Sequence, residues 1–475
     1  MNKTLVFVLL TVTLTVPSSA EDTPIATVSL QDMIDTTAGL VELPAGTHVI
    51  DATLVVDLTK TGYRGLRGAN GATRIVMTAP GPAISIVGNH KGTANPASVT
   101  EHTWEAERFP VVSGLEILGR HPEADGIELY RTLKCTIQNV LIRNCRYGVH
   151  LTERNRNFLL ADSHIYDGRD SGVFLDNCNL HQVNIIGNHI SYNRRAGIRQ
   201  YNGDVHNVQI TGNDIEYNHN VQVTKDGAEQ RDDELMTGEI VLESPNGLIS
   251  EYTIVSNTIQ SISQSRGANI LIVGSEKHTP HAARTIAISG NIIGSRDKNI
   301  VLEHAVRVTI TGNTIYGGKV LNVQAKHTQN LVLSANNIGS RPSMHKVVDG
   351  YDDGILFENC TNAILDGNIL SNLRYGGAAQ GGAITLINAR NIRVSDCQII
   401  HPRFRGIHLI NGLACVFSDN TIEGTGEDFQ TAIEVSGASK SNLIQQNLII
   451  TETEKSITMQ HNTGTLTGNT IITGK

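Results

Sequence analysis

Residues 126–201 carry a concentration of side chains that can transfer protons or bind anions. A glycine–apolar–x–apolar phrase recurs in this stretch, and the residue two places after each glycine is in turn Glu128, His150, Phe174 and Arg199. The residue two places further on is Tyr130, Thr152, Asp176 and Tyr201. Carboxylates, imidazole and phenol are general acids and bases, and the Arg fork suits carboxylate or sulfate. The pattern therefore predicts chemistry on an anionic substrate.

Basic and aromatic residues accompany these positions. Six of the eleven tyrosines lie between Tyr130 and Tyr217, and arginines outnumber acids locally, although the whole chain has 38 Lys and Arg against 46 Asp and Glu. That mild overall acidity excludes general coating of nucleic acid. The local enrichment favours a binding surface for an acidic polymer, and a solvated sheet face is the alternative. The predicted substrate-binding residues are Tyr130, Arg131, Arg154, Phe174 and Arg195.

The first hypothesis for the chemistry is β-elimination, or the related C5 epimerisation, beside a uronate. This reaction requires a neutralised carboxylate, a base for the C5 proton and an acid for the leaving oxygen. Arg199, with Arg154, is the candidate for neutralisation. His150 or Tyr201 is the candidate base, and Tyr130 or Tyr201 the candidate acid.

Two further hypotheses use the same residues differently. A glycoside hydrolase would use Glu128 and Asp176, which the repeat places two coils apart, near ~10 Å by strand spacing. A non-catalytic surface or polysaccharide-binding protein would need neither, and aromatic residues are only 4% of the chain. Product analysis separates these hypotheses, because elimination leaves an unsaturated uronate and hydrolysis does not.

A second repeated phrase, apolar–x–Gly–Asn–x–Ile, shows what positions these residues. It begins at Ile185, Ile210, Ile288, Ile310 and Leu466, and its asparagines are 25 residues apart from Asn188 to Asn213 and 22 apart from Asn291 to Asn313. Short strands with alternating apolar residues at this period predict one all-β domain, a right-handed parallel β-helix. The repeated Asn is expected to take a left-handed turn conformation and to stack its amide on the next coil.

The chain divides into three parts by composition. Residues 1–20 have the pattern of a cleaved signal peptide, which predicts a secreted or periplasmic protein, and no later run is apolar enough to span a membrane. Residues 21–110 are expected to form a cap and irregular first coils, with a short helix that begins at a capping box, Ser29 to Asp32. Residues 111–475 are expected to form regular coils, with loop insertions near 219–237 and 339–353.

Cysteines and acidic residues could add bridges or metal. The repeat places most of the six cysteines many coils apart, so they are expected to be buried free thiols, with a Cys135–Cys145 pair left open. The carboxylates of Asp349 to Asp353 make Ca²⁺ possible, but no metal site is assigned. The expected partner is an acidic polysaccharide bound by a monomer, without nucleic acid or membrane.

With its repeats, signal sequence, capping segment and Leu43-Pro44-Ala45-Gly46-Thr47 start, the chain resembles the pectin-lyase-like superfamily of right-handed parallel β-helices. The superfamily includes polysaccharide lyases, glycoside hydrolases and uronan C5-epimerases, so the resemblance implies the fold and leaves the activity open. The Gly-His-Gly and paired-Asp pattern of polygalacturonases is absent, as is the Asp-Pro-His motif of alginate epimerases. No catalytic residue is transferred by motif.

Overall fold

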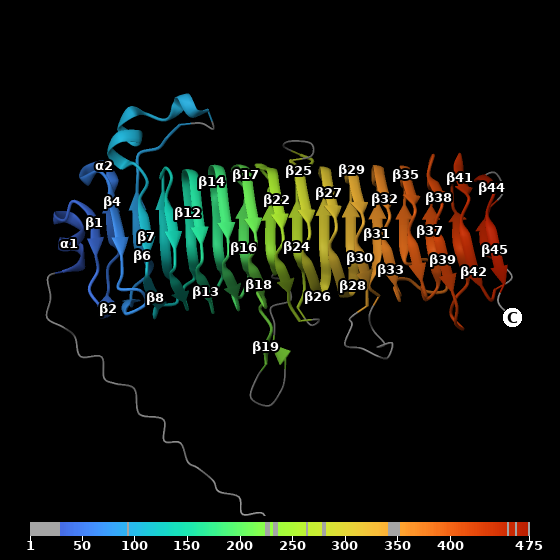
Figure 1. Ribbon diagram of the computed structural model, residues 1–475, viewed down its shortest axis with the longest axis horizontal. Coiled ribbons are helices and arrows are strands. Elements are labelled where there is room, and N and C mark those ends of the chain that lie inside the picture. The colour runs from blue at the N-terminus through green and yellow to red at the C-terminus, as the bar shows by residue number, and fades with distance from the viewer. Residues whose placement is uncertain are drawn as a thin grey trace, which may run out of the picture.

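The chain forms an elongated solenoid with its amino-terminal coils at one end and its carboxy-terminal coils at the other (Figure 1). The computed structural model describes residues 29–92, 95–223, 229–230, 236–262, 265–277, 282–340, 352–453, 456–460 and 463–473. The predicted signal peptide and parts of both predicted insertions lie outside these residues. Within them, no helix has the length and apolarity needed to cross a membrane.

Each coil contributes a strand to three faces, and all pairings between coils are parallel, giving one continuous sheet of 43 strands. Face 1 contains β3 (Leu54–Asp57), β6 (Gly81–Val87), β9 (Ala124–Tyr130), the first parts of β12 (Tyr147–Ala161) and β14 (Ser171–Ile186), β16 (Ala196–Tyr201), β21 (Gly238–Glu243), β24 (Ala268–Val273), the last parts of β26 (Ile292–Glu303) and β28 (Thr314–Lys326), β31 (Gly354–Glu358), β34 (Ile384–Ile387), β37 (Arg405–Ile410), β40 (Thr431–Ser436) and β43 (Ile457–Met459).

Face 2 follows face 1 along the chain. It contains β1 (Gly39–Glu42), β4 (Arg64–Arg67), β7 (Val111–Ser113), β10 (Thr136–Gln138), the last parts of β12 and β14, β17 (Asp204–Thr211), β22 (Leu248–Val255), β25 (Ala283–Ser289), β27 (Ala305–Thr311), β29 (Gln329–Ser334), β32 (Thr361–Asp366), β35 (Arg390–Ser395), β38 (Val416–Ser418), β41 (Asn442–Gln445) and β44 (Gly464–Thr467).

Face 3 completes each coil and leads back to face 1. It contains β2 (Gly46–Ile50), β5 (Thr73–Met77), β8 (Leu115–Gly119), β11 (Leu141–Arg143), β13 (His164–Tyr166), β15 (His189–Ser191), β18 (Asp214–Glu216), β23 (Thr258–Gln260), the first parts of β26 and β28, β30 (Asn337–Gly339), β33 (Ile369–Ser371), β36 (Gln398–Ile400), β39 (Thr421–Gly424), β42 (Leu448–Thr451) and β45 (Thr470–Thr473). The same three faces run through residues 39–110.

Alternating apolar residues fill the interior, as the glycine phrase predicts. Ile127, Leu129, Val149 and Leu151 are fully buried in one core that continues through the coils. Burying such a side chain is worth about 1.5–3 kcal/mol, so stacked coils hold one another together. The glycine of the phrase is required by close packing, because a Cβ at Gly172 would lie 2.6 Å from Cγ2 of Ile190 and 2.7 Å from the Gly197 carbonyl oxygen.

The repeated asparagines form a ladder inside the turn between faces 2 and 3. Asn188 Nδ2 donates to Asn213 Oδ1 at 3.0 Å, and Asn213 Nδ2 donates to Asn257 Oδ1 at the same distance. The predicted stacking of amides is therefore confirmed. The predicted left-handed conformation of the Asn is wrong, because the preceding residue adopts it: φ is 69° at Gly187 and 65° at Gly212.

A short helix covers the first coil, as predicted. In α1 (Leu30–Thr36), Leu30 and Ile34 are buried against the core. The Gln31 side chain pairs with the edge of β3, accepting from Val55 N at 2.8 Å and donating to Val55 O at 3.0 Å. Ser29 makes no side-chain capping hydrogen bond, so the expected capping box does not form. Gln31 instead satisfies backbone groups that an open sheet edge would expose.

Other segments add short helices or modify the coils. The segment between β6 and β7 contains two short helical turns, Pro96–Ser98 and Thr103–Glu107, and α2 (Leu58–Thr61) lies beside it. Two strands of the first predicted insertion, β19 (Gln222–Val223) and β20 (Glu229–Gln230), pair antiparallel below the solenoid in Figure 1. All six cysteines are buried and free, so Cys135 and Cys145 do not pair.

Candidate functional site

The predicted alignment of the outward residues on face 1 is confirmed by the strand register. His150 pairs with Glu128 and with Phe174, and Phe174 pairs with Arg199. In the neighbouring column, Thr152 pairs with Tyr130 and with Asp176, and Asp176 pairs with Tyr201. These eight residues on β9, β12, β14 and β16 are called the polar strip below.

His150 occupies the centre of the polar strip and is held on several sides. Its ring is stacked on Phe174, with centroids 5.4 Å apart and an interplanar angle of 4°, and Tyr147 lies 4.8 Å away. Nε2 of His150 is 3.2 Å from Oδ2 of Asp176. That contact favours the tautomer with the proton on Nε2. Nδ1 is buried and has no hydrogen-bond partner among the described residues.

Arg199 is a buried cation that forms no ion pair with any described residue. Only 5% of the residue is exposed, and its guanidinium lies 4.5 Å from the Phe174 ring centroid and 5.2 Å from that of Tyr201. Nε has no hydrogen-bond partner within the described part of the chain. Burial lowers the pKa of the Arg199 guanidinium, and the charge of Arg195 lowers it further. The two rings provide cation–π contacts, and the carboxylates of Asp170 and Glu243 raise the pKa of the guanidinium in opposition to burial.

The remaining residues of the strip and its margin differ in exposure. The Tyr201 side chain is exposed beside Arg199, and half-buried Tyr130 lies under the guanidinium of Arg131 at 4.8 Å. Arg131 forms an ion pair with Glu153 at 3.3 Å. Arg195 lies at the edge of face 1, 3.7 Å from a carboxylate oxygen of Asp170. The structure therefore brings all of these predicted residues to one surface.

Arg154 does not join this surface. It follows Glu153, whose φ of 60° turns the chain from face 1 to face 2. Its side chain is buried, and its Nε donates to Nε2 of His90 at 3.2 Å. Burial and the charges of Arg154 and Arg156 lower the pKa of His90 to about 4, which suits a neutral acceptor. Arg154 consequently attaches the excursion between β6 and β7 to the coil.

Glu128 and Asp176 are separated by the imidazole of His150. Glu128 accepts a hydrogen bond from Ser85 Oγ at 3.0 Å, whereas Asp176 contacts His150. The two acids differ by two coils and by two residues along the strand. Strand spacings give about 12 Å between their Cα atoms. An inverting hydrolase places its carboxyl groups roughly 6.5–9.5 Å apart.

The two edges of face 1 are built differently. At the edge with face 2, the excursion between β6 and β7 is attached by Gly88 N, which donates to Tyr130 O at 2.8 Å, and by Lys134, which lies 3.7 Å from the Trp104 ring centroid.

At the edge with face 3, a fully buried ion pair of Arg296 and Glu239, 2.8 Å apart, fixes both ends of the first insertion. Asn218 N donates to Glu239, and Arg296 donates to the Asn218 carbonyl oxygen and to the Thr237 hydroxyl. Because these contacts flank the insertion, they set where it leaves the solenoid.

Beyond Arg199, the outward column of face 1 changes from polar to apolar residues. Val241, Leu271 and Val301 form a separate buried apolar cluster. Gln324 follows Val301 in the column, because the register shifts between Arg296 and Lys298 and again at Leu321. Asn322 points inward and accepts from Asn299 Nδ2 at 2.7 Å.

Sequence reasoning overlooked the later polar residues of this column. His408 and Glu434 are neighbours in the register, and His408 is almost fully buried. Its Nδ1 accepts from Gly381 N at 3.0 Å, and Arg405 forms an ion pair with Glu434. The glycine phrase at Gly406 marked this strand, but not the loop that covers it.

The possible Ca²⁺ site receives no ligand set from the described residues, which contain no group of three or more His, Cys, Asp or Glu placed to hold a metal. Asp353 instead accepts from Ser340 Oγ and from Arg374 N, at 2.9 and 3.1 Å. Asp349 and its neighbours to residue 351 lie outside the described residues. Calcium stays a prediction.

Comparison with known families agrees with this architecture. The family described as "Right handed beta helix region" matches residues 112–230, 238–422 and 343–475, which is most of the chain. The chain belongs to the right-handed β-helix family. The resemblance to pectin-lyase-like proteins is thereby confirmed at the level of the fold. No curated protein matches the sequence.

Solved structures of other β-helix proteins are similar only distantly. The A-module of mannuronan C-5 epimerase AlgE6 from Azotobacter vinelandii has 12% identity and a TM-score of 0.35, with 92% of each chain covered. Tailspike protein 3 of bacteriophage CBA120 has 12% identity and a TM-score of 0.41, covering 77% of this chain and 58% of the tailspike chain. The catalytic domain of a GH87 α-1,3-glucanase has 13% identity and a TM-score of 0.31, covering 94% and 68%. Scores this low carry no argument about activity.

Proposed function

We propose that this β-helix protein acts on an acidic polysaccharide, by β-elimination beside a uronate or by the related C5 epimerisation. The observation that carries the proposal is Arg199, a residue only 5% exposed whose Nε has no hydrogen-bond partner and whose guanidinium forms no ion pair among the described residues. An unpaired buried charge is costly, so a protein that keeps one has a use for it. A uronate carboxylate would supply the missing charge.

Neutralising the carboxylate is the first requirement of the reaction. A free carboxylate opposes removal of the adjacent C5 proton, since the intermediate gathers further negative charge on it. The Arg199 guanidinium would bind this carboxylate and stabilise the developing charge. Phe174 and Tyr201 both contact the guanidinium, so little reorganisation is needed.

Tyr201 is the best placed group for proton transfer. Its ring lies against Arg199, and its side chain is exposed to a bound chain. A phenolate can act as the base, and the protonated phenol can donate to the leaving oxygen. His150 is the alternative base, but its free Nδ1 is buried. Asp176 contacts Nε2 of His150 and thereby orients the ring.

The partners of the two acids disfavour hydrolysis, because Glu128 is bound by Ser85 and Asp176 contacts His150. A hydrolase would need Glu128 and Asp176 to act across one glycosidic bond, yet His150 stands between them. Export of a monomer to the extracellular space or periplasm, where such polymers occur, is the remaining part of the proposal and rests on the signal sequence alone.

The test is a screen of the protein against pectate, alginate, ulvan and glycosaminoglycans. Ultraviolet absorbance of unsaturated uronates, reducing ends and C5 configuration by NMR are followed together. Arg199→Gln and Tyr201→Phe are compared with wild type, and Arg390→Gln, which alters an exposed arginine on face 2, is the matched control. Loss of activity in both strip variants, with the control intact, supports the proposal. Reducing ends without unsaturation would replace it with hydrolysis, and binding without any product would replace it with a non-catalytic role.

A further inference from the structure

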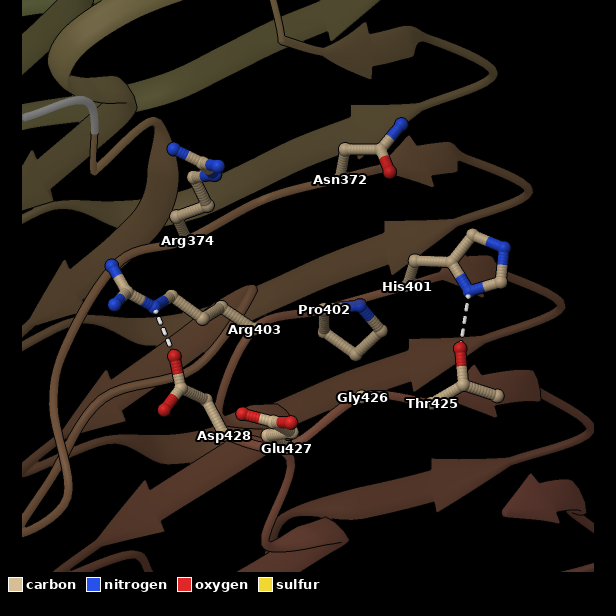
Figure 2. Close-up of a pocket in the computed structure, with 9 residues that line it drawn as sticks. All are labelled: Asn372, Arg374, His401, Pro402, Arg403, Thr425, Gly426, Glu427 and Asp428. Carbon is tan, nitrogen blue, oxygen red and sulfur yellow. Dashed lines mark hydrogen bonds and ion pairs between the residues drawn. The ribbon is translucent and has the colours of Figure 1, made fainter. Parts of the chain in front are cut away.

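A second polar surface lies near the carboxy-terminal end, where face 3 turns into face 1. A cavity of about 460 Å³ opens there between successive turns, lined among others by Asn372, Arg374, His401, Arg403, Glu427 and Asp428 (Figure 2). Ligand pockets typically have roughly 300–1,000 Å³. The cavity is therefore large enough for a sugar residue.

Two arginines occupy equivalent places on successive coils of this cavity. Arg374 and Arg403 each follow a paired strand of face 3, and Arg403 N donates to the Leu373 carbonyl oxygen at 3.0 Å. Their Cα atoms are therefore about 4.8 Å apart. Both side chains line the same cavity, as Figure 2 shows. Arg403 already forms an ion pair with Asp428 at 2.8 Å, so an anionic ligand would add to that pair rather than meet two uncompensated charges.

The surrounding contacts hold this pair in place. Asp428 Oδ2 accepts from Arg403 Nε at 2.8 Å, which orients the guanidinium while its Nη atoms have no hydrogen-bond partner among the described residues. Arg374 is almost fully buried, and its backbone N donates to Asp353. His401 Nδ1 and Thr425 Oγ1, which also line the cavity, are 3.1 Å apart. The site is thus built on hydrogen-bonded turns of consecutive coils.

The other lining groups suit sugar hydroxyls. The Asn372 amide can donate and accept, and Glu427 can accept. Guanidinium groups bind carboxylate and sulfate esters through paired charge-assisted hydrogen bonds. We propose that this cavity is a second binding site for an acidic sugar residue, carrying a carboxylate or a sulfate, of the polymer that the polar strip acts on. This inference rests on the proposed function for the identity of the polymer.

The polar strip lies on face 1, and the cavity lies at the turn that leads from face 3 into face 1, further along the solenoid. Seven register steps separate Arg199 on β16 from the coil of Arg403, which precedes β37. At strand spacing, this is about 34 Å. A polymer longer than this distance could occupy both sites, and the second contact would then form at a high effective concentration. Short oligosaccharides would bind each site separately.

The test measures binding of uronate trisaccharides and of long polyuronates to the full protein by calorimetry, with sulfated monosaccharides as a second probe. Wild type, Arg199→Gln, Arg403→Gln and Arg390→Gln are compared. We expect two trisaccharide sites in wild type and one in each strip or cavity variant. We expect the affinity for long polymer to fall about tenfold or more in Arg403→Gln, from the loss of a charge-assisted pair. If the sulfated probe binds wild type and does not bind Arg403→Gln, sulfate is the preferred anion. If the sulfated probe does not bind wild type, carboxylate is the preferred anion.

The outcomes separate the two proposals. If Arg199→Gln weakens binding and Arg403→Gln titrates like wild type, the cavity proposal is overturned and the proposed function stands. If only Arg403→Gln weakens binding, the cavity binds acidic sugar and the function assigned to the polar strip is overturned. Arg403→Lys keeps the charge but loses the fork, and its correct folding would be checked by unchanged melting. Wild-type affinity in Arg403→Lys would also contradict recognition through paired hydrogen bonds.

Discussion

The guanidinium of Arg199 lies 4.5 Å from the centroid of the Phe174 ring, one coil earlier in the same outward column. Phe174 in turn is stacked on His150, so a cation, an apolar ring and an imidazole follow one another along the solenoid. This order places the cation at the end of an aromatic stack, where a ligand carboxylate can reach it without displacing a protein counter-ion.

Replacing Arg199 should lower the affinity for substrate and raise the stability of the folded protein. Arg199→Met keeps the stem that packs on Phe174 and removes the unpaired buried charge, so we expect the free energy of unfolding to rise by about 1 kcal/mol. Affinity for acidic oligosaccharide should fall at the same time. Thermal melting and calorimetric titration of one preparation measure both. A lower melting temperature in Arg199→Met would show that the charge is compensated in the free protein.

Tyr201 and Glu128 should respond oppositely to conservative substitution. Tyr201→Phe retains the ring against Arg199 and removes the proton, so kcat should fall about 10²–10⁴-fold. Glu128→Gln preserves shape and hydrogen bonding to Ser85, and we expect elimination to persist within a few-fold. Initial rates on the substrate found in the screen provide the comparison. The reverse result, inactive Glu128→Gln and active Tyr201→Phe, would favour a hydrolase.

The loop over His408 should loosen in acid. Burial lowers the pKa of His408 to about 4, with Arg405 also lowering it and Glu434 opposing. The folded state thus prefers neutral imidazole, which can accept from Gly381 N and contacts Ser436 Oγ at 3.0 Å. Its contribution is complete above pH ~6.5 and declines as the pH falls towards ~4, by about 2–3 kcal/mol in total.

Hydrogen exchange of residues 376–382 at pH 7 and pH 4.5 measures this change, after correction for intrinsic rates. His408→Gln is the control, because it cannot acquire the charge. We expect protection in wild type to decrease in acid and protection in His408→Gln to change less. Equal changes in the two proteins would assign the pH effect to other groups, such as Asp353, whose pKa burial raises to about 6.

Removing one asparagine from the middle of the ladder should lower the free energy of unfolding more than removing one from its end. Asn213→Ala removes the acceptor of Asn188 N, now at 3.0 Å in a buried turn, whereas Asn188 Nδ2 keeps the carbonyl oxygens of Leu160 and Ile186. A cost of about 1–3 kcal/mol is expected for one unsatisfied buried donor. Asn469→Ala removes the last, half-buried rung, where water can replace it, so its effect on melting should be clearly smaller. Similar decreases in melting temperature for both variants would indicate that the ladder is not the source of stability.

The fold and the alignment of the polar strip could be predicted because both repeat. Period and alternation fix which residues face outward, and the pairing of His150 with Glu128 and Phe174 follows from them. The left-handed conformation was predicted for the ladder asparagines themselves, but the residue before each one has the positive φ. The register shift at Leu321 could not be predicted, because such a shift leaves no trace in the apolar pattern.

The other features lie where the repeat gives no information. The contact of His150 with Asp176 is diagonal, between columns, and the burial of Arg154 depends on an excursion from an earlier coil. The cavity at Arg403 is made by turns of unequal length, and the apolar cluster beyond Arg199 is defined only by packing. Such contacts depend on how loops fold back on the coils, which periodicity does not encode.

The ladder also shapes how this molecule can change over evolutionary time. Successive asparagines meet across sequence separations of 25, 44, 34, 22 and 23 residues, yet every contact has nearly the same length. Extra residues are therefore accommodated outside the coil, and the axial distance between any two rungs is independent of the chain length between them. Insertions in the turns can remodel the loops beside face 1 without moving Arg199 relative to Arg403, whereas the gain or loss of one whole coil would change that distance in a single step of ~4.8 Å.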